Sequence, residues 1–226
     1  MRASELYGLE IITTAETARV WLETTLARLQ GSVLEQARVL DLCWILDIPA
    51  GIAMRFLEGL NQTERSRCLV ITANLSPEYL QHLWNLGVRA LIGEPFDLED
   101  IARALEELSS GHRFRLTHTL EPRVEGTRFE VLVAAARFES NKAIALRLGK
   151  AEQTVKNEVG VLVDTLGLDS RDQLHSYFFG DWMYLPSPYS DVHDRITRGD
   201  GRKYVIAEYR SFEPEILGRG KRKKVK

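Results

Sequence analysis

The sequence predicts an α/β domain with a reduced parallel sheet, then an all-α domain of four short helices, then an irregular C-terminal extension containing a β-hairpin. Two observations predict it. Short apolar runs alternate with helical patterns in the first half, and glycine-punctuated helical segments follow. We therefore expect one domain in 1–110, a linker in 111–124, a second domain in 125–180 and an extension in 181–226.

Length and composition fit this division. The chain has 226 residues, of which 44% are hydrophobic and 27% charged, a globular balance with room for two cores. No apolar run approaches the roughly 18 residues that span a bilayer, and the N-terminus lacks the apolar centre of a signal peptide. We expect a cytoplasmic protein with no membrane partner. Cys43 and Cys68 lie in apolar runs and are expected to act as small hydrophobes.

Four apolar runs in the first domain each precede a helical pattern. LEII, from Leu9, precedes a pattern from Glu16 to Leu29. The other runs are LDLCWIL (40–46), CLVIT (68–72) and RALI (89–92), with helices expected at Ile52 to Leu60, Pro77 to Leu86, and Leu98 to Leu108 after an Asp97 N-cap. This alternation is typical of a parallel sheet covered on both faces. The apolar stripe Ile101, Leu105 and Leu108 is expected to be core, with an interface as the alternative.

Two segments of this domain resemble a known family. NLGVRALIGEPFDLEDIARALEEL (85–108) and WILDIPAG resemble the receiver domain of two-component response regulators. The resemblance places Asp47 at the phosphoacceptor position and Thr72 at the switch position. The interval between the first strand and Asp47 is shorter than in a typical receiver, so we expect the second helix to be missing or reduced.

The chemistry of a receiver is not matched. Phosphoryl transfer to a carboxylate needs a divalent cation held by acidic residues and a lysine that neutralises charge. Thr13 and Thr14 occupy the acidic-pair position, Glu94 replaces the lysine before Pro95, and Leu91 replaces the switch aromatic. Glu94 would repel a phosphoryl group. We therefore expect a pseudo-receiver that serves dimerisation or senses another signal, with Asp47 and Thr72 vestigial.

In the second domain, the helical patterns and the glycines that end them are typical of a helix-turn-helix. A helix is expected from Gly126, and a second short helix ends before Gly149. A third runs from near Glu152 to Leu166 with Val155 on its inner face, and a fourth spans Ser170 to Phe179. This order places the start of the third helix in a DNA major groove.

EGTRFEVLVAAARFESNKAIALRL and TVKNEVGVLVDTLGL resemble the DNA-binding module of the LuxR/NarL family of transcription regulators. By position, the resemblance implies that Lys156 and Asn157 face base edges and that Lys142, Gln153 and Thr154 lie near the DNA backbone. The alternative is that these are ordinary solvated surface residues.

The third helix departs from the family. From Ala151 to Leu166 it carries one basic and three acidic residues, although phosphate attraction normally supplies much of the affinity for DNA. Glu158 stands where the family commonly has histidine. Gly160 stands where some members have a base-contacting lysine, and a helical glycine costs about 1 kcal/mol relative to alanine.

The extension is not explained by the resemblance. GDWMYLPSPYSDV is expected to form an irregular strap, and DRIT and RKYVIAEYRSF the two strands of a hairpin around a Gly-Asp-Gly turn. Residues 1–110 carry 9 basic and 16 acidic residues, whereas 181–226 carry 11 basic and 7 acidic. The extension could supply missing phosphate contacts; a solvated terminus is the alternative. The candidate contacts are Arg198, Arg202, Lys203, Lys221, Arg222, Lys223 and Lys224.

These observations favour a phosphorylation-independent transcription regulator that binds double-stranded promoter DNA as a homodimer. The alternative is a protein-interaction factor that binds another regulator or RNA polymerase without strong DNA affinity of its own. An enzyme is the weakest reading, because no phosphate-binding glycine loop, metal-ligand cluster or nucleophile elbow occurs. We expect no cofactor.

Overall fold

The computed structural model describes residues 10–13, 16–26, 28, 40–48, 50–94, 96–117, 121–180, 207–208 and 211–212. The chain divides into two compact units. The first unit holds Met1–Ala73, His82–Thr119 and Gly201–Lys226, and the second holds Asn74–Gln81 and Leu120–Asp200. Each unit is described by itself.

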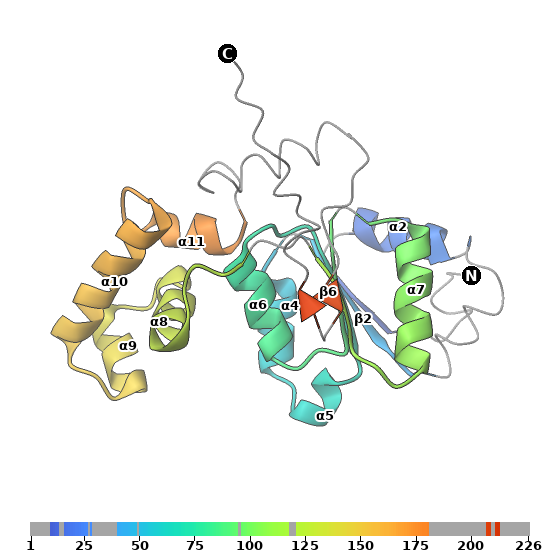
Figure 1. Cartoon of the computed structure of the whole chain (residues 1–226), viewed down its shortest axis with the longest axis horizontal. Coiled ribbons are helices and arrows are strands. Elements are labelled where there is room, and N and C mark those ends of the chain that lie inside the picture. Colours follow the sequence, from blue (N-terminus) through green and yellow to red (C-terminus); the bar gives the residue numbers. More distant parts are fainter. Residues whose placement is uncertain are drawn as a thin grey trace, which may run out of the picture. The chain divides into compact units, whose positions relative to one another are not determined.

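The first unit is built on a parallel sheet whose described strands follow one another in sequence order, β1 to β5 (Figure 1). The strands are β1 (Glu10–Ile12), β2 (Cys43–Asp47), β3 (Cys68–Thr72), β4 (Ala90–Gly93) and β5 (Phe114–Leu116). Asp47 is in register with Thr72, and Thr72 is in register with Gly93. The carboxyl ends of the three central strands therefore meet at one edge of the sheet.

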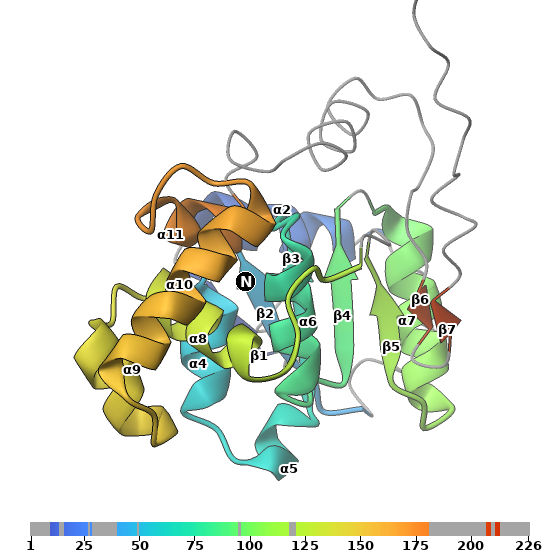
Figure 2. The same cartoon turned by 60° about the vertical axis from the view of Figure 1, so that its left-hand side comes forward.

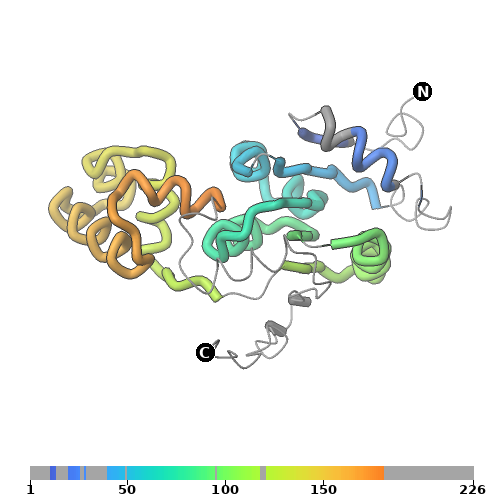
Figure 3. Tube along the Cα trace, turned by 90° about the horizontal axis from the view of Figure 1, so that it is seen from above, coloured from blue at the N-terminus to red at the C-terminus, as the bar shows by residue number. Residues whose placement is uncertain are grey.

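Helices cover both faces of this sheet. Their bounds are α2 (Glu16–Leu26), α4 (Ile52–Glu58), α5 (Gln62–Arg65) and α7 (Leu98–Ser109). A further helix, α6 (Pro77–Asn85), begins in the second unit and ends in the first. α7 lies on one side of the sheet and α4 on the other (Figures 1 and 3). The α7 side holds a continuous apolar core that includes Leu22, Trp44 and Ile92. A parallel sheet covered in this way fits a receiver-like α/β domain.

The helix expected after an Asp97 N-cap is confirmed as α7. Asp97 is its N-cap, and the Asp97 carboxylate accepts hydrogen bonds from the backbone N–H groups of Glu99 and Asp100. Ile101, Leu105 and Leu108 are fully buried in the sheet core, which decides between the two expectations for this stripe. Cys43 and Cys68 are buried in β2 and β3, as expected of small hydrophobic residues.

The expected linker contains a strand. β5 lies within 111–124 and pairs in parallel with β4, with Ile92 opposite Leu116. Its three residues are too few to show a period, and Arg115 interrupts the apolar pattern. Arg115 is nevertheless buried, and its Nε donates to Thr117 Oγ1 at 3.2 Å. Burial lowers the pKa of Arg115 to about 10, so the guanidinium stays charged at neutral pH.

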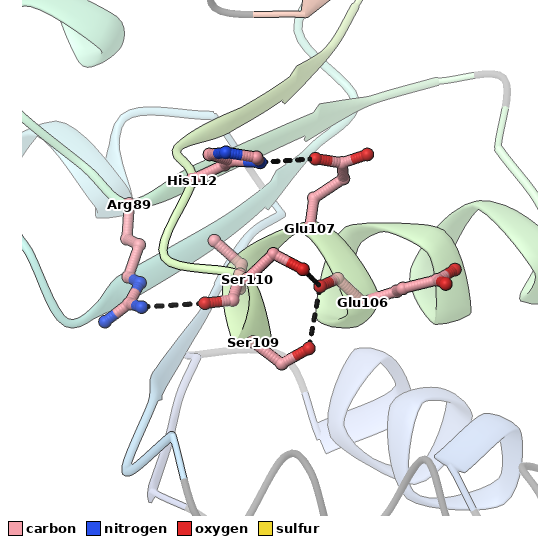
Figure 4. Close-up of polar contacts among 7 residues, drawn as sticks. Arg89, Glu106, Glu107, Ser109, Ser110 and His112 are labelled. Carbon is pink, nitrogen blue, oxygen red and sulfur yellow. Dashed lines mark hydrogen bonds and ion pairs between the residues drawn. The ribbon is translucent and has the colours of Figure 1, made fainter.

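Polar contacts fix the corner between α7 and β5 (Figure 4). The guanidinium of Arg89 donates to the carbonyl oxygen of Leu108 at 2.8 Å, and the Ser109 hydroxyl donates to the Glu106 carbonyl oxygen at 2.7 Å. His112 Nδ1 lies 3.0 Å from Glu107 Oε2. These side-chain contacts add to the backbone hydrogen bonds that the Glu106 and Leu108 carbonyl groups accept from Ser110 and Gly111 at the end of α7.

The strand order departs from that of a receiver. Receivers such as CheY have the order 2-1-3-4-5, in which the second strand forms one edge. Here β1 pairs directly with β2, and no strand is described between them, since 29–39 lie outside the described residues. β5 adds a strand at the opposite edge. Compared with a receiver sheet, the described sheet therefore has one strand fewer at the β1 edge and one strand more at the β5 edge.

The second unit contains four helices at the expected places (Figure 2). They are α8 (Gly126–Ala136), α9 (Asn141–Leu148), α10 (Glu152–Leu166) and α11 (Gln173–Phe178). Ser140 caps α9, because its hydroxyl accepts a hydrogen bond from the Ala143 N–H. Gly149 and Gly167 end α9 and α10 with φ of 63° and 69°, a left-handed conformation that favours glycine.

Apolar side chains on all four helices form one core. α10 packs against both α8 and α9, and α11 packs against α8. The buried members include Leu132, Ile144, Val155, Leu162 and Phe178. Burying a side chain of this size contributes roughly 1.5 to 3 kcal/mol, so these contacts hold short helices that would not be stable alone.

The described part of the extension differs from the expectation. β6 (Ala207–Glu208) and β7 (Ser211–Phe212) form an antiparallel pair with Glu208 opposite Ser211. The pair lies within the stretch 202–212 that is expected to form a single strand, and the expected Gly-Asp-Gly turn lies outside the described residues. The expected strap and the rest of 181–226 lie outside the described residues. None of the helices that the structure describes has the length and apolar character needed to cross a membrane.

Candidate nucleic-acid interface

Asp47 ends β2 and is fully buried. Its Oδ1 accepts a hydrogen bond from the Ala53 backbone N–H at 2.9 Å, and its Oδ2 accepts one from the Thr72 hydroxyl at 2.9 Å. The structure thus brings the expected phosphoacceptor and switch positions together. Both oxygens of the carboxylate are engaged by the protein itself.

The contact between Asp47 and Ala53 has a structural consequence. Gly51 is the N-cap of α4, with φ of 100°, and offers no side chain to the first turn of the helix. The Asp47 carboxylate supplies the missing acceptor from the preceding strand. A negative group at this end of a helix is also favoured by the helix dipole.

The residues that surround a receiver's metal site are changed in this chain. Thr13 and Glu94 are partly buried at the ends of β1 and β4, and Leu91 is fully buried within β4. Thr14 and Pro95 lie outside the described residues. Among the described residues, no three His, Cys, Asp or Glu side chains are grouped so as to hold a metal ion.

The first two turns of α10 have one buried face and one exposed face. Val155 is fully buried and Val159 nearly so, which fixes the rotation of the helix. The remaining residues of these turns point away from the core. The exposed polar residues are the predicted Gln153, Thr154, Lys156 and Asn157, together with Glu152.

Two of these exposed residues contact each other. Gln153 Nε2 donates to Asn157 Oδ1 at 2.9 Å, a spacing of four residues that places both side chains on one stripe of the helix. The ammonium group of Lys156 lies beside this stripe. It makes no ion pair with any other residue that the structure describes.

The acidic character of α10 is partly neutralised within the second unit. Glu158 Oε2 accepts a hydrogen bond from Arg128 Nε of α8 at 2.7 Å. The side chain of Glu158 is only 23% exposed, whereas that of Arg128 is 54% exposed. Part of the negative charge counted on α10 from the sequence is thus neutralised by a residue thirty positions earlier.

Lys142 is exposed in the first turn of α9. It too forms no ion pair within the described residues. The amino end of a helix carries partial positive charge and exposed N–H groups, and no acidic residue lies in this first turn. Lys142 and the start of α9 therefore present positive potential together.

Gly160 lies one turn beyond Lys156 on the exposed side of α10. A Cβ placed at this position would meet no atom within 4 Å. The fold therefore does not require glycine here, and its cost of about 1 kcal/mol is not offset by packing in this unit.

A buried carboxylate in the second unit was not anticipated from the sequence. Glu78, in the first turn of α6, is fully buried. Its Oε1 accepts from the Arg123 backbone N–H at 2.7 Å, and its Oε2 from the Tyr177 hydroxyl at 2.5 Å. Burial raises the pKa of Glu78, and these two hydrogen bonds oppose the rise. Its hydrogen-bond partners are distant in the sequence, so no local sequence pattern indicates that Glu78 is buried.

Two apolar side chains in the helical unit are exposed. Leu146 of α9 is 86% exposed, and Phe138, in the turn before α9, is 65% exposed. Phe138 has a positive φ of 61° and stacks on His175 with ring centroids 4.6 Å apart.

The candidate phosphate contacts of the extension, from Arg198 to Lys224, lie outside the described residues.

No protein-family model and no curated protein matches this chain. Among solved structures, the DNA complex of the two-component response regulator RcsB is similar, with 16% identity over 75% of this chain and 96% of that chain and a TM-score of 0.41. RcsB from Salmonella typhimurium is similar at 16% identity, over 75% and 97%, with a TM-score of 0.36. The response regulator ChrA of a heme-sensing system is similar at 15% identity, over 75% and 94%, with a TM-score of 0.33.

Proposed function

We propose that this chain is a DNA-binding transcription regulator in which α8 to α11 form a LuxR-type helix-turn-helix. One observation carries the proposal. The buried face of α10 fixes an exposed face that consists of polar residues and an unpaired lysine, at the start of the helix that follows a glycine turn. That is the arrangement with which a recognition helix enters a major groove. Lys156 and Asn157 would face bases, and Lys142, Gln153 and Thr154 would lie near phosphates.

Salt-dependent DNA binding by the full-length chain tests this function. A pool of random duplexes should bind at low salt, and the affinity should fall steeply as salt rises, because each neutralised phosphate releases counterions. Lys156→Ala should weaken binding, whereas Arg55→Ala, which removes an exposed cation from α4, should not. Absence of binding at low salt would exclude the proposal.

The same proposal assigns no phosphoacceptor role to the first unit. The full burial of Asp47 and the engagement of both its oxygens support a pseudo-receiver that acts without phosphorylation. The unit would then serve homodimerisation or sense another signal. Incubation with acetyl phosphate and magnesium should leave the mass of the chain unchanged. A stable phosphoryl adduct that is lost in Asp47→Ala would contradict this assignment.

A protein-interaction factor is the second candidate, and the exposed Leu146 favours it. A leucine that is 86% exposed on α9 offers an apolar contact to a partner such as another regulator or RNA polymerase. This candidate predicts no DNA binding at low salt and a partner interaction that is lost in Leu146→Ser. In that case Lys156→Ala should leave the interaction unchanged.

A further inference from the structure

The pairing of Gln153 with Asn157 limits which base α10 can recognise. A free asparagine or glutamine on a helix surface rotates among several rotamers, and ordering it upon binding is unfavourable. Here the hydrogen bond of 2.9 Å ties the two amides together before any ligand arrives. Their outward hydrogen-bonding groups are therefore held in place.

Asn157 keeps both a donor and an acceptor for a ligand. Gln153 donates to one lone pair of Asn157 Oδ1, so the Asn157 NH₂ group and the second lone pair of Oδ1 remain available. Exchange of N and O on both amides would reverse the bond and leave Asn157 its second N–H and its carbonyl oxygen. In either assignment Asn157 presents both a donor and an acceptor.

Among the four bases, only adenine offers the complement of both groups in the major groove. Adenine presents the N7 acceptor beside the N6 amino donor. Guanine presents two acceptors, cytosine one donor, and thymine one acceptor beside a methyl group. Asn157 can therefore satisfy its donor and its acceptor together on adenine alone.

Gly160 gives an independent reason to expect close approach at this stripe. Residues 153, 157 and 160 follow one another at spacings of four and three, so they share one side of α10. Because a Cβ at Gly160 would meet nothing in the protein, the space beside Asn157 is open to a ligand. Exposed Asp164 lies one turn further along the same stripe, so the contact with DNA should end at Gly160.

We propose that Asn157 reads the major-groove edge of an adenine and that Gln153 acts as the positioning residue for it. This inference rests on the DNA-binding function proposed above. It adds a base preference and a division of roles, because Gln153 would act through Asn157 and not only through the DNA backbone.

Selection from random duplexes with the full-length chain, followed by base substitution, tests this inference. One adenine in the selected sequence should lose roughly 5- to 150-fold in affinity when it is replaced by another base or by 7-deazaadenine, which lacks N7. Asn157→Ala should bind all these duplexes with the weaker affinity, so that the base change has no further effect. Asn85→Ala, an exposed asparagine at the end of α6, is the matched control and should keep the preference.

Two more variants distinguish base recognition by Asn157 from its positioning by Gln153. Asn157→Asp presents acceptors only and should shift the preference to cytosine, whose N4 amino group is a donor. Gln153→Ala should keep adenine as the preferred base but reduce the discrimination. If the wild-type chain binds DNA and Asn157→Ala keeps the same base preferences, the inference is wrong and the proposed function stands. If the wild-type chain binds no DNA at low salt, both are wrong.

Discussion

The polar group at the carboxyl end of β2 is buried and hydrogen-bonded within the protein, whereas the polar groups at the start of α10 are exposed. At the end of β2, Asp47 is fully buried, and the Ala53 N–H and the Thr72 hydroxyl engage both of its oxygens. At the start of α10, Lys156 and Asn157 are exposed, and the lysine has no ion-pair partner among the described residues. A polar group that is satisfied inside the protein stabilises the fold, whereas one that is turned outward remains available to a ligand. Under the proposed function, the carboxylate at β2 is structural and the exposed residues at α10 bind DNA.

The largest expected effect comes from removing the buried carboxylate at β2. Asp47→Ala leaves the Ala53 N–H and the Thr72 hydroxyl without this acceptor, and each buried unsatisfied group costs about 1 to 3 kcal/mol. We expect the free energy of unfolding to fall by about 2 to 4 kcal/mol in urea denaturation. The folded variant should keep its affinity for DNA. A variant as stable as the wild type would show that Asp47 has no structural role.

Glu78 is expected to have the next largest effect, and it depends on pH. Its pKa is raised in the folded state, so between the ordinary value of 4.5 and the raised value the folded chain holds more protons than the unfolded chain. This group's contribution to stability is therefore greatest at low pH and falls as pH rises through that window. Glu78→Gln keeps polar atoms for Arg123 and Tyr177 and should remove that fall. Comparing thermal unfolding of both proteins between pH 4 and neutrality measures this, and Glu106→Gln is an exposed-surface control.

Replacing Gly160 tests the exposed side of α10, because the substitution should have opposite effects on stability and on DNA binding. Gly160→Ala should stabilise α10 by about 1 kcal/mol, since alanine is the better helix former and its methyl group meets no atom of the protein. The same methyl group should weaken DNA binding, because it fills the space beside Asn157. Chemical denaturation and fluorescence anisotropy give the two values. A stabilised variant with unchanged DNA affinity would mean that nothing approaches α10 at this point.

The smallest expected effect concerns the ion pair of Glu158 with Arg128. Glu158→Gln should change stability by less than about 1 kcal/mol, because the arginine is half-exposed and such pairs contribute little. It should also strengthen DNA binding several-fold at low salt and less at high salt, since it removes a negative charge and releases Arg128. Arg128→Gln should do the reverse. Equal effects of both variants on DNA affinity would rule out the electrostatic explanation.

The helices of the second unit could be predicted because their signals are local. Gly149 and Gly167 mark helix ends, and the inward valines and leucines of α10 keep a helical period, so its bounds of Glu152 and Leu166 follow from the sequence. The exposed residues of the candidate interface follow from the same period. Only the hypothesis that they contact DNA needed the family resemblance.

The missed features depend on residues that are distant in the sequence. β5 has three residues and contains an arginine, so its place in the sheet depends on its pairing with β4 and not on a pattern. Glu78 resembles an ordinary acidic residue in a first helical turn, and its partner Tyr177 lies 99 positions later. The neutralisation of Glu158 by Arg128 has the same cause. Charge counted along a single helix therefore overstated the repulsion of DNA.

The most direct test of the contrast between β2 and α10 is the DNA affinity of the full-length chain before and after incubation with acetyl phosphate and magnesium. The duplex would come from the selection described above, and mass spectrometry would follow the same sample. We predict a single affinity under both conditions and no mass increase of about 80 Da, the size of a phosphoryl group. A phosphoryl adduct on Asp47 that changes the affinity about tenfold, and is lost in Asp47→Asn, would contradict the account.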